Sequence, residues 1–63
     1  MALTFKLNDS VEVLLPAGWR SGKIFKILKG YYMLTGTTGY EVHGKVFVTI
    51  TSARSLKKIK LND

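Results

Sequence analysis

The segment from residue 11 to residue 28 most constrains the fold, because two apolar stretches flank a short loop. The first stretch reads as a half-buried β-strand, in which Val11, Val13 and Leu15 alternate with Ser10, Glu12 and Leu14. The loop Pro16-Ala17-Gly18 ends this strand, since proline cannot donate to a ladder and glycine allows a left-handed turn. Gly22 then opens a second apolar segment, Lys23 to Leu28, so the pattern predicts strand, tight loop and strand.

Three lysines in the second strand, Lys23, Lys26 and Lys29, recur at a spacing that a straight strand would split between two faces. A β-bulge near Phe25 reconciles this spacing with a sheet. A helix over Trp19 to Leu28 is the alternative, because it would place the lysines on one side. Its interior Gly22 would cost about 1 kcal/mol relative to Ala, and β-branched and aromatic residues favour a strand.

The rest of the chain predicts further short strands separated by turn residues. We expect a tight hairpin at Lys29-Gly30, a 3₁₀ turn within residues 51–55, and a turn or bulge at His43-Gly44. The expected strands and loops are a strand at Tyr31 to Thr35, a loop at Gly36 to Gly39, strands at Tyr40 to Val42 and Lys45 to Ile50, and a last strand at Leu56 to Leu61. Many short strands without a long helix imply a closed or nearly closed barrel, since closure removes exposed edges.

Length and cysteine content limit how this fold is stabilised. The 63 residues allow one domain over 1–63, with a lead-in at 1–8 and a frayed tail at 62–63. With no cysteine, neither a disulfide framework nor a thiolate zinc site is available. The chain shows neither a long apolar span nor a secretory leader, so the cytoplasm is the expected location and no membrane is expected as a partner.

The chain offers no pattern typical of catalysis, and we expect no enzyme, no cofactor and no metal site. His43 is the single histidine and is expected to be a turn residue; Glu41 could orient it only if both side chains share one strand face. The acids are scattered, without the spacing of a carboxylate pair. Gly36 to Gly39 lacks the lysine and hydroxyl residue of a phosphate-binding loop and precedes no helix.

A net charge of +6 and a pI near 9.9 favour polyanionic partners, although basic residues that only promote solubility explain the same charge. Aromatic residues beside basic groups are typical of barrels that stack bases. Trp19 could stack a base or close one end of the core. Of Tyr31 and Tyr32, strand alternation sends one ring inward and one outward. The expected nucleic-acid contacts are Trp19, Arg20, Lys23, Lys26, Arg54, Lys57, Lys58 and Lys60, with Trp19, Tyr31 and Tyr32 as stacking residues.

From about residue 8 onward the chain resembles small SH3-like barrels of the Tudor, Agenet and KOW type. The residues that carry this resemblance are Val11-Glu12-Val13, Trp19, Gly22-Lys23-Ile24, Tyr31 to Leu34 and Arg54 to Ile59. The resemblance implies an all-β, five-stranded SH3-like barrel with short loops and one 3₁₀ turn before the last strand. Members of these groups bind modified-lysine tails, RNA, DNA or ribosomal partners.

The layout is also similar to that of the type II plasmid dihydrofolate reductases, which are small SH3-like barrels. The similarity rests on a Val-x-Val strand, an Ala-Gly-Trp-x-x-Gly-x-Ile stretch from Ala17 to Ile24, Gly39-Tyr40-x-Val42, and the ending from Val46 to Ile59. That family holds folate and nicotinamide with a Val-Gln-Ile-Tyr segment. The matching residues here, Val46-Phe47-Val48-Thr49, lack the glutamine and the tyrosine, so the reductase activity is not carried over.

The sequence therefore favours a non-enzymatic binding module that contacts nucleic acid through a basic, aromatic-bearing face. The main alternative is a protein-interaction adaptor that uses its loops or an exposed sheet edge. A homo-oligomeric subunit belongs with that alternative, because Phe47 or Val48 exposed on a barrel face would be better buried against a neighbour. A reductase-like enzyme is the third hypothesis.

Overall fold

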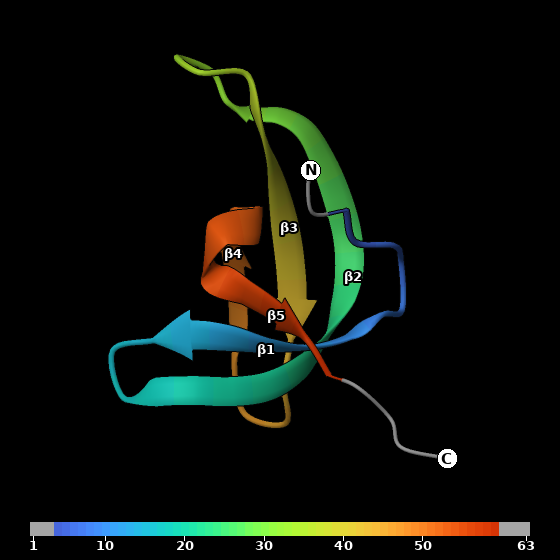
Figure 1. Ribbon diagram of the computed structural model, residues 1–63, viewed down its shortest axis with the longest axis vertical. Helices are drawn as coiled ribbons and strands as arrows, with labels where there is room; N and C mark the ends of the chain where they lie inside the picture. Colours follow the sequence, from blue (N-terminus) through green and yellow to red (C-terminus); the bar gives the residue numbers. More distant parts are fainter. Residues whose placement is uncertain (1–3, 60–63) are drawn as a thin grey trace.

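The computed structural model describes residues 4–59, which form one antiparallel β-sheet (Figure 1). Its elements are β1 (Ser10–Leu15), β2 (Gly18–Tyr32), β3 (Thr37–His43), β4 (Val48–Thr51), the 3₁₀ helix η1 (Ala53–Ser55) and β5 (Leu56–Lys58). The predicted all-β class with five strands is confirmed, as is the 3₁₀ turn before the last strand. In this part of the chain no helix has the length and apolar character needed to cross a membrane.

The strand order in the sheet is β4-β3-β2-β1-β5. Long, curved β2 pairs with β1 through its first half and with β3 through its second half (Figure 1). Within residues 4–59 no ladder joins β4 to β5, so the sheet is bent but is not closed by hydrogen bonds. The five strands are therefore established, whereas the expected closure of the barrel is not.

The segment Trp19 to Leu28 is strand throughout, so the helical alternative is wrong. The register between β2 and β3 shifts between Ile24 and Lys26, which leaves Phe25 without a cross-strand partner. This shift confirms the predicted bulge. Lys23 pairs with His43 and Lys26 pairs with Glu41. Because His43 and Glu41 are two residues apart in β3, the bulge brings both lysines to the same face of the sheet.

The hairpin between β2 and β3 lies further along the chain than predicted. Strand β2 continues through Lys29-Gly30 to Tyr32, and the turn occupies Met33 to Gly36. Gly30 has the left-handed φ of 70° expected of a turn residue, but it lies within a second register irregularity, between Leu28 and Tyr32. The N–H of Gly36 donates to the Tyr32 carbonyl at 2.7 Å and closes the true turn. Of the strand predicted at Tyr31 to Thr35, only Tyr31 and Tyr32 are therefore in a strand, and of the loop predicted at residues 36–39, only Gly36 is in the turn.

The remaining boundaries follow the predictions in part. Tyr40 to Val42 lies inside β3 and not in a strand of its own, and the strand expected from Lys45 begins at Val48. The Gly44 N–H donates to the Phe47 carbonyl at 2.9 Å, so the predicted turn at His43-Gly44 follows the last residue of β3. Strand β5 is shorter than expected; the predicted continuation to Leu61 and the tail at 62–63 lie outside the described residues.

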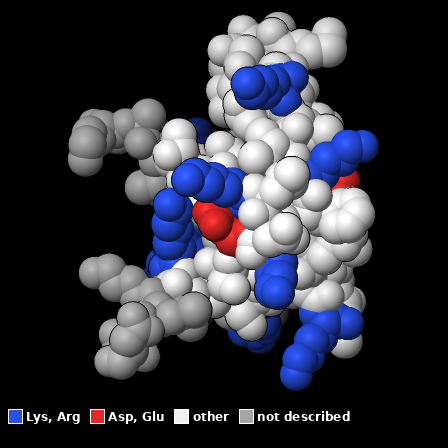
Figure 2. Space-filling model, turned by 90° about the vertical axis from the view of Figure 1, so that its right-hand side faces the viewer, with Lys and Arg blue, Asp and Glu red and all other residues white. Residues whose placement is uncertain are grey.

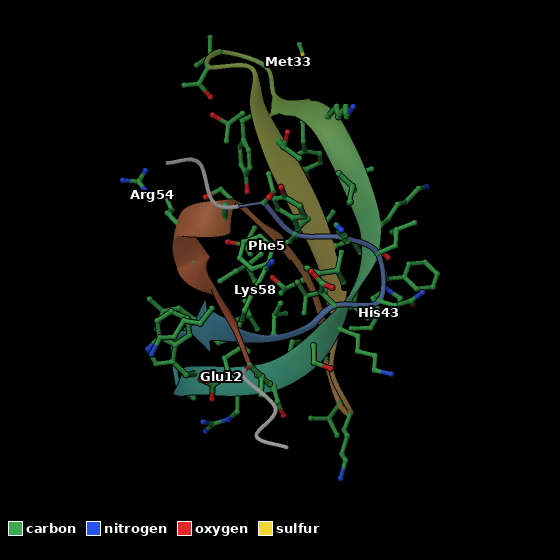
Figure 3. The ribbon with its side chains drawn as sticks, turned by 45° about the vertical axis from the view of Figure 1, so that its right-hand side comes forward. Phe5, Glu12, Met33, His43, Arg54 and Lys58 are labelled. Atoms are coloured by element: carbon green, nitrogen blue, oxygen red, sulfur yellow. The ribbon has the colours of Figure 1, made fainter. Side chains whose placement is uncertain are left out.

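The core draws on β1, β2, β3, β5 and the lead-in. Its fully enclosed members come from the strands, while Phe5 from the lead-in is 4% exposed and meets the Tyr40 ring edge-on at 5.5 Å between centroids (Figure 3). The buried hydrophobic residues are Phe5, Val11, Val13, Ile24, Tyr40, Val42 and Leu56. None of the buried residues within 4–59 is polar or charged. The sequence of the lead-in did not predict that Phe5 is buried.

Gly22 marks the place where the two halves of the bent sheet approach each other. A Cβ atom at this position would lie 2.8 Å from the Val42 side chain and 2.9 Å from the His43 carbonyl oxygen. The backbone of β3 cannot yield as a flexible side chain would. Glycine is therefore required here for close packing between β2 and β3.

Phe5→Ala tests whether the lead-in completes the core. We expect the free energy of unfolding to fall by about 3–5 kcal/mol, because the truncation leaves a cavity against Tyr40. A domain of this size has a total stability of roughly 3–9 kcal/mol, so the expected loss is a large share of the total. Urea unfolding followed by Trp19 fluorescence measures the change. Leu7→Ala, at a side chain that is 56% exposed, is the control and should cost less than about 0.5 kcal/mol; equal effects of the two variants would contradict the packing of Phe5.

Candidate functional site

The basic side chains of the described residues are all on the surface. The chain has ten Lys and Arg residues, and each of them within residues 4–59 is exposed, while Lys60 lies outside this range. Figure 2 shows Lys and Arg atoms spread over one face from top to bottom, with few Asp or Glu atoms among them. Within the same range an ion pair joins His43 to Glu41, and no lysine or arginine forms an ion pair. The basic groups are thus available to a polyanion.

Trp19 is half-buried on β2, and its indole ring is covered by a lysine from β5. The Lys57 Nζ lies 4.0 Å from the ring centroid, in a cation–π contact worth about 0.5–1 kcal/mol at an exposed site. Strand β1 lies between β2 and β5, and its Glu12 pairs with Ser21 of β2 on one side and with Lys57 of β5 on the other. Trp19 is two residues from Ser21 and so lies on the same face of the sheet, where Lys57 can reach its ring. A base that stacked on this face of Trp19 would have to displace the ammonium group.

Arg20 follows Trp19 but does not share its surroundings. One guanidinium nitrogen donates to the Trp19 carbonyl at 3.0 Å. The side chain borders a shallow recess of about 350 Å³ that the turn after β3 also lines, through Lys45 and Phe47. Arg20 thus shares this recess with Lys45, which the sequence did not single out.

Lys23 and Lys26 lie on the face of the sheet where Phe25, Glu41 and His43 gather. The Phe25 ring stacks on the His43 imidazole, with centroids 4.0 Å apart and planes at 13°. His43 Nε2 and Glu41 Oε2 are 2.6 Å apart, so these two side chains do share one strand face. His43 ends β3 (Figure 3). Within residues 4–59 no group of three His, Cys, Asp or Glu side chains is arranged to hold a metal ion.

A groove lies between the β2–β3 hairpin and η1, and it brings Tyr31, Tyr32 and Arg54 together. It has a volume of about 790 Å³, and Arg54 is the charged residue among those that line it. We call it the hairpin groove; it is lined by Tyr31, Tyr32, Met33, Leu34, Thr35, Thr37, Ser52, Ala53 and Arg54. Figure 3 shows Met33 at the tip of the hairpin and the side chain of Arg54 projecting from η1. Residues from distant parts of the sequence thus share one surface.

Both tyrosines of the hairpin groove are exposed, Tyr31 at 47% and Tyr32 at 36%. The prediction that one ring points inward is wrong, because this end of β2 extends beyond the core. The two rings meet edge-on at 5.0 Å between centroids. Tyr31 also lies directly over Gly39, where an added Cβ would come within 2.9 Å of the Tyr31 Cβ and Cγ. The absence of a side chain at Gly39 therefore positions the ring.

The predicted contact residues form several groups and not one continuous strip. Lys58 lies apart from Lys57, with its Nζ 5.7 Å from the centroid of the Phe5 ring (Figure 3). The sequence missed Met33 and Leu34, which are 88% and 103% exposed at the hairpin tip. Gly36 just after them was the available signal, since glycine is typical of turns.

No protein-family model, curated protein or solved structure matches this chain. The functional proposal therefore rests on the side chains described above.

Gly39→Ala tests the position of Tyr31. The added methyl group would overlap the start of the Tyr31 side chain, so we expect the ring to move and its edge contact with Tyr32 to be lost. Aromatic ¹H–¹³C NMR spectra should show large shifts of the Tyr31 ring resonances. Gly36→Ala is the control: it meets nothing within 4 Å, costs about 1 kcal/mol because its φ is 72°, and should leave Tyr31 in place. Unchanged Tyr31 shifts in Gly39→Ala would contradict the described packing.

Proposed function

We propose that the protein is a non-enzymatic binding module that contacts single-stranded nucleic acid through the hairpin groove. The observation that carries this proposal is the meeting of two exposed tyrosines and an arginine, Tyr31, Tyr32 and Arg54, in one groove. Proteins that bind single-stranded nucleic acid without sequence preference combine two components. Aromatic rings stack on bases of any type, and nearby cationic side chains contact the phosphate backbone.

Each component has a definite chemical role in the proposal. The exposed phenol rings offer faces on which bases stack, and such stacking is worth about 1–3 kcal/mol per base. The Arg54 guanidinium presents several N–H donors to a phosphate. Among residues 4–59 no carboxylate lines the groove, so none of these residues repels the phosphate there. Duplex DNA hides its base faces within the stack, which favours a single strand as the ligand.

The surrounding charge supports the same class of ligand. The net charge is +6, and the exposed lysines outside the groove raise the local concentration of a polyanion without selecting its sequence. Lys23, Lys26 and Lys57 lie outside the groove and are proposed to give additional, non-specific phosphate contacts. Trp19 is proposed to take part only after Lys57 moves from its ring.

The strand order, the bent β2 and the 3₁₀ turn before β5 support a place among the SH3-like barrels. Resemblance to barrels of the Tudor, Agenet and KOW type implies binding modules, several of which take nucleic acid. The reductase activity of the type II plasmid enzymes forms no part of the proposal.

Salt dependence tests the electrostatic part of the proposal. We expect anisotropy titrations of a labelled single-stranded oligonucleotide to show log K falling linearly with log salt, with a slope of about −0.7 for each phosphate contacted. A duplex of the same length should bind more weakly at every salt concentration. Affinity that barely changes with salt would contradict the mechanism and favour a protein partner.

Substitutions in the groove separate stacking from phosphate contact. Tyr31→Ala should weaken binding about 5- to 150-fold at an unchanged salt slope, whereas Tyr31→Phe should retain most of the affinity. Arg54→Ala should both weaken binding and reduce the slope by about one contact. Lys45→Ala removes the same charge at the far end of β3 and is the matched control (Figure 1). If Lys45→Ala and Arg54→Ala weakened binding equally, the groove would not be the binding site.

A further inference from the structure

The two outer strands of the sheet differ in how they are protected. Strand β5 carries Lys57 and Lys58, and edge lysines discourage pairing with another strand. Strand β4 reads Val48-Thr49-Ile50-Thr51 and has neither charge nor proline. All its residues have high β-propensity. An edge of this kind is a template for strand pairing unless something covers it.

The hydrogen-bond pattern shows which backbone groups of β4 are free. The Gly44 N–H bonds to the Phe47 carbonyl, and hydrogen-bonded pairs alternate along an antiparallel ladder. In the β3–β4 register the pairs of Thr49 and Thr51 therefore bond to β3. The N–H and C=O groups of Val48 and Ile50 point away from β3, and among residues 4–59 no other strand lies on that side.

We propose that this edge pairs with β4 of a second copy of the chain, in an antiparallel ladder around a two-fold axis at Thr49. In this register Val48 faces Ile50 of the second copy and Thr49 faces its own counterpart. The four outward N–H groups of the two copies are then all donated to the four outward carbonyls. If the register between the two copies shifted by one residue, the outward groups of Val48 and Ile50 would face threonines whose backbone groups already bond to β3. If it shifted by two residues, only one outward residue of each β4 would find a partner in the other β4.

The side chains agree with this register. Val48 is 64% exposed and Ile50 is 36% exposed, and both lie on the same face because they are two residues apart in a strand. Val48 pairs with His43, on which the 59% exposed Phe25 stacks. Pairing would join the two copies' Val48 and Ile50 side chains into one apolar strip flanked by Phe25. Phe47, in contrast, already packs against the core of its own copy.

The hydrogen-bond register favours a second copy as the partner, because the outward groups of β4 are complementary to those of an identical strand turned about Thr49. The charge of +6 on each chain opposes this association, and β4 adds no charged residue to the contact. Four strand residues from each copy make a small interface, well below the area of a stable complex, so we expect dissociation in the range of roughly 10–100 µM.

Disulfide trapping tests the register in a chain that has no natural cysteine. In a non-hydrogen-bonded antiparallel pair the Cα atoms are about 4.5 Å apart, within the range that a disulfide spans. Thr49→Cys should therefore form a disulfide-linked dimer rapidly under mild oxidation. Thr51→Cys is the control on the same strand and face, and it would lie about 14 Å along the strand from its counterpart. Equal rates, or faster linkage through Thr51→Cys, would overturn the proposal.

Sedimentation equilibrium without nucleic acid tests the association in a chain without a crosslink. Val48→Lys places a charge at the edge and should raise the dimer dissociation constant at least about tenfold. Leu7→Lys makes the same change of charge at an exposed residue in the turn before β1 and should leave it unchanged. Circular dichroism checks that both variants fold. A wild-type chain that stays monomeric at millimolar concentration, or two variants that weaken association equally, would overturn the proposal.

Discussion

The structure depends on the course of β2, which belongs to both halves of the bent sheet. Its first half pairs with β1 and its second half with β3, so the strand has to bend without losing its partners. Two local features allow this. Gly22 lets the backbone of β3 approach to a distance that no side chain would permit, and the bulge at Phe25 absorbs one residue where the register changes. Because of the bend, Val11 and Val13 of one half face Ile24 and Val42 of the other, and these four residues are fully buried.

The same bend decides how the surface is divided. Lys57 meets Trp19 on one half of the sheet, whereas Lys23 and Lys26 share the face of the other half with Glu41 and His43. The end of β2 extends past the core as a hairpin and brings its tyrosines to η1. A small core thus leaves most aromatic and basic side chains outside it, and the topology decides which of them become neighbours.

Local sequence patterns predicted well where a single strand or turn was concerned. The alternation in β1, the bulge at Phe25 and the 3₁₀ turn each follow from residues close together in the chain. Lys29-Gly30 failed as a hairpin because a glycine with positive φ suits a strand irregularity as well as a turn, and only pairing with β3 distinguishes the two. Phe5 was missed because no periodicity marks a lead-in residue that closes the core from a loop.

The candidate site shows the same division. Sequence identified Tyr31, Tyr32 and Arg54 singly, but it could not bring them into one groove, since their proximity arises from the placement of η1 beside the hairpin. The sequence also predicted that both tyrosines lie in a strand, but it did not indicate that this strand extends beyond the core.

By itself, the sequence determined the all-β class, the basic charge and the residue types available for binding, because propensity, charge and turn chemistry are local properties. Only the tertiary structure decided the register, the groove and the two unequal edges, because these depend on pairing between residues far apart in the chain.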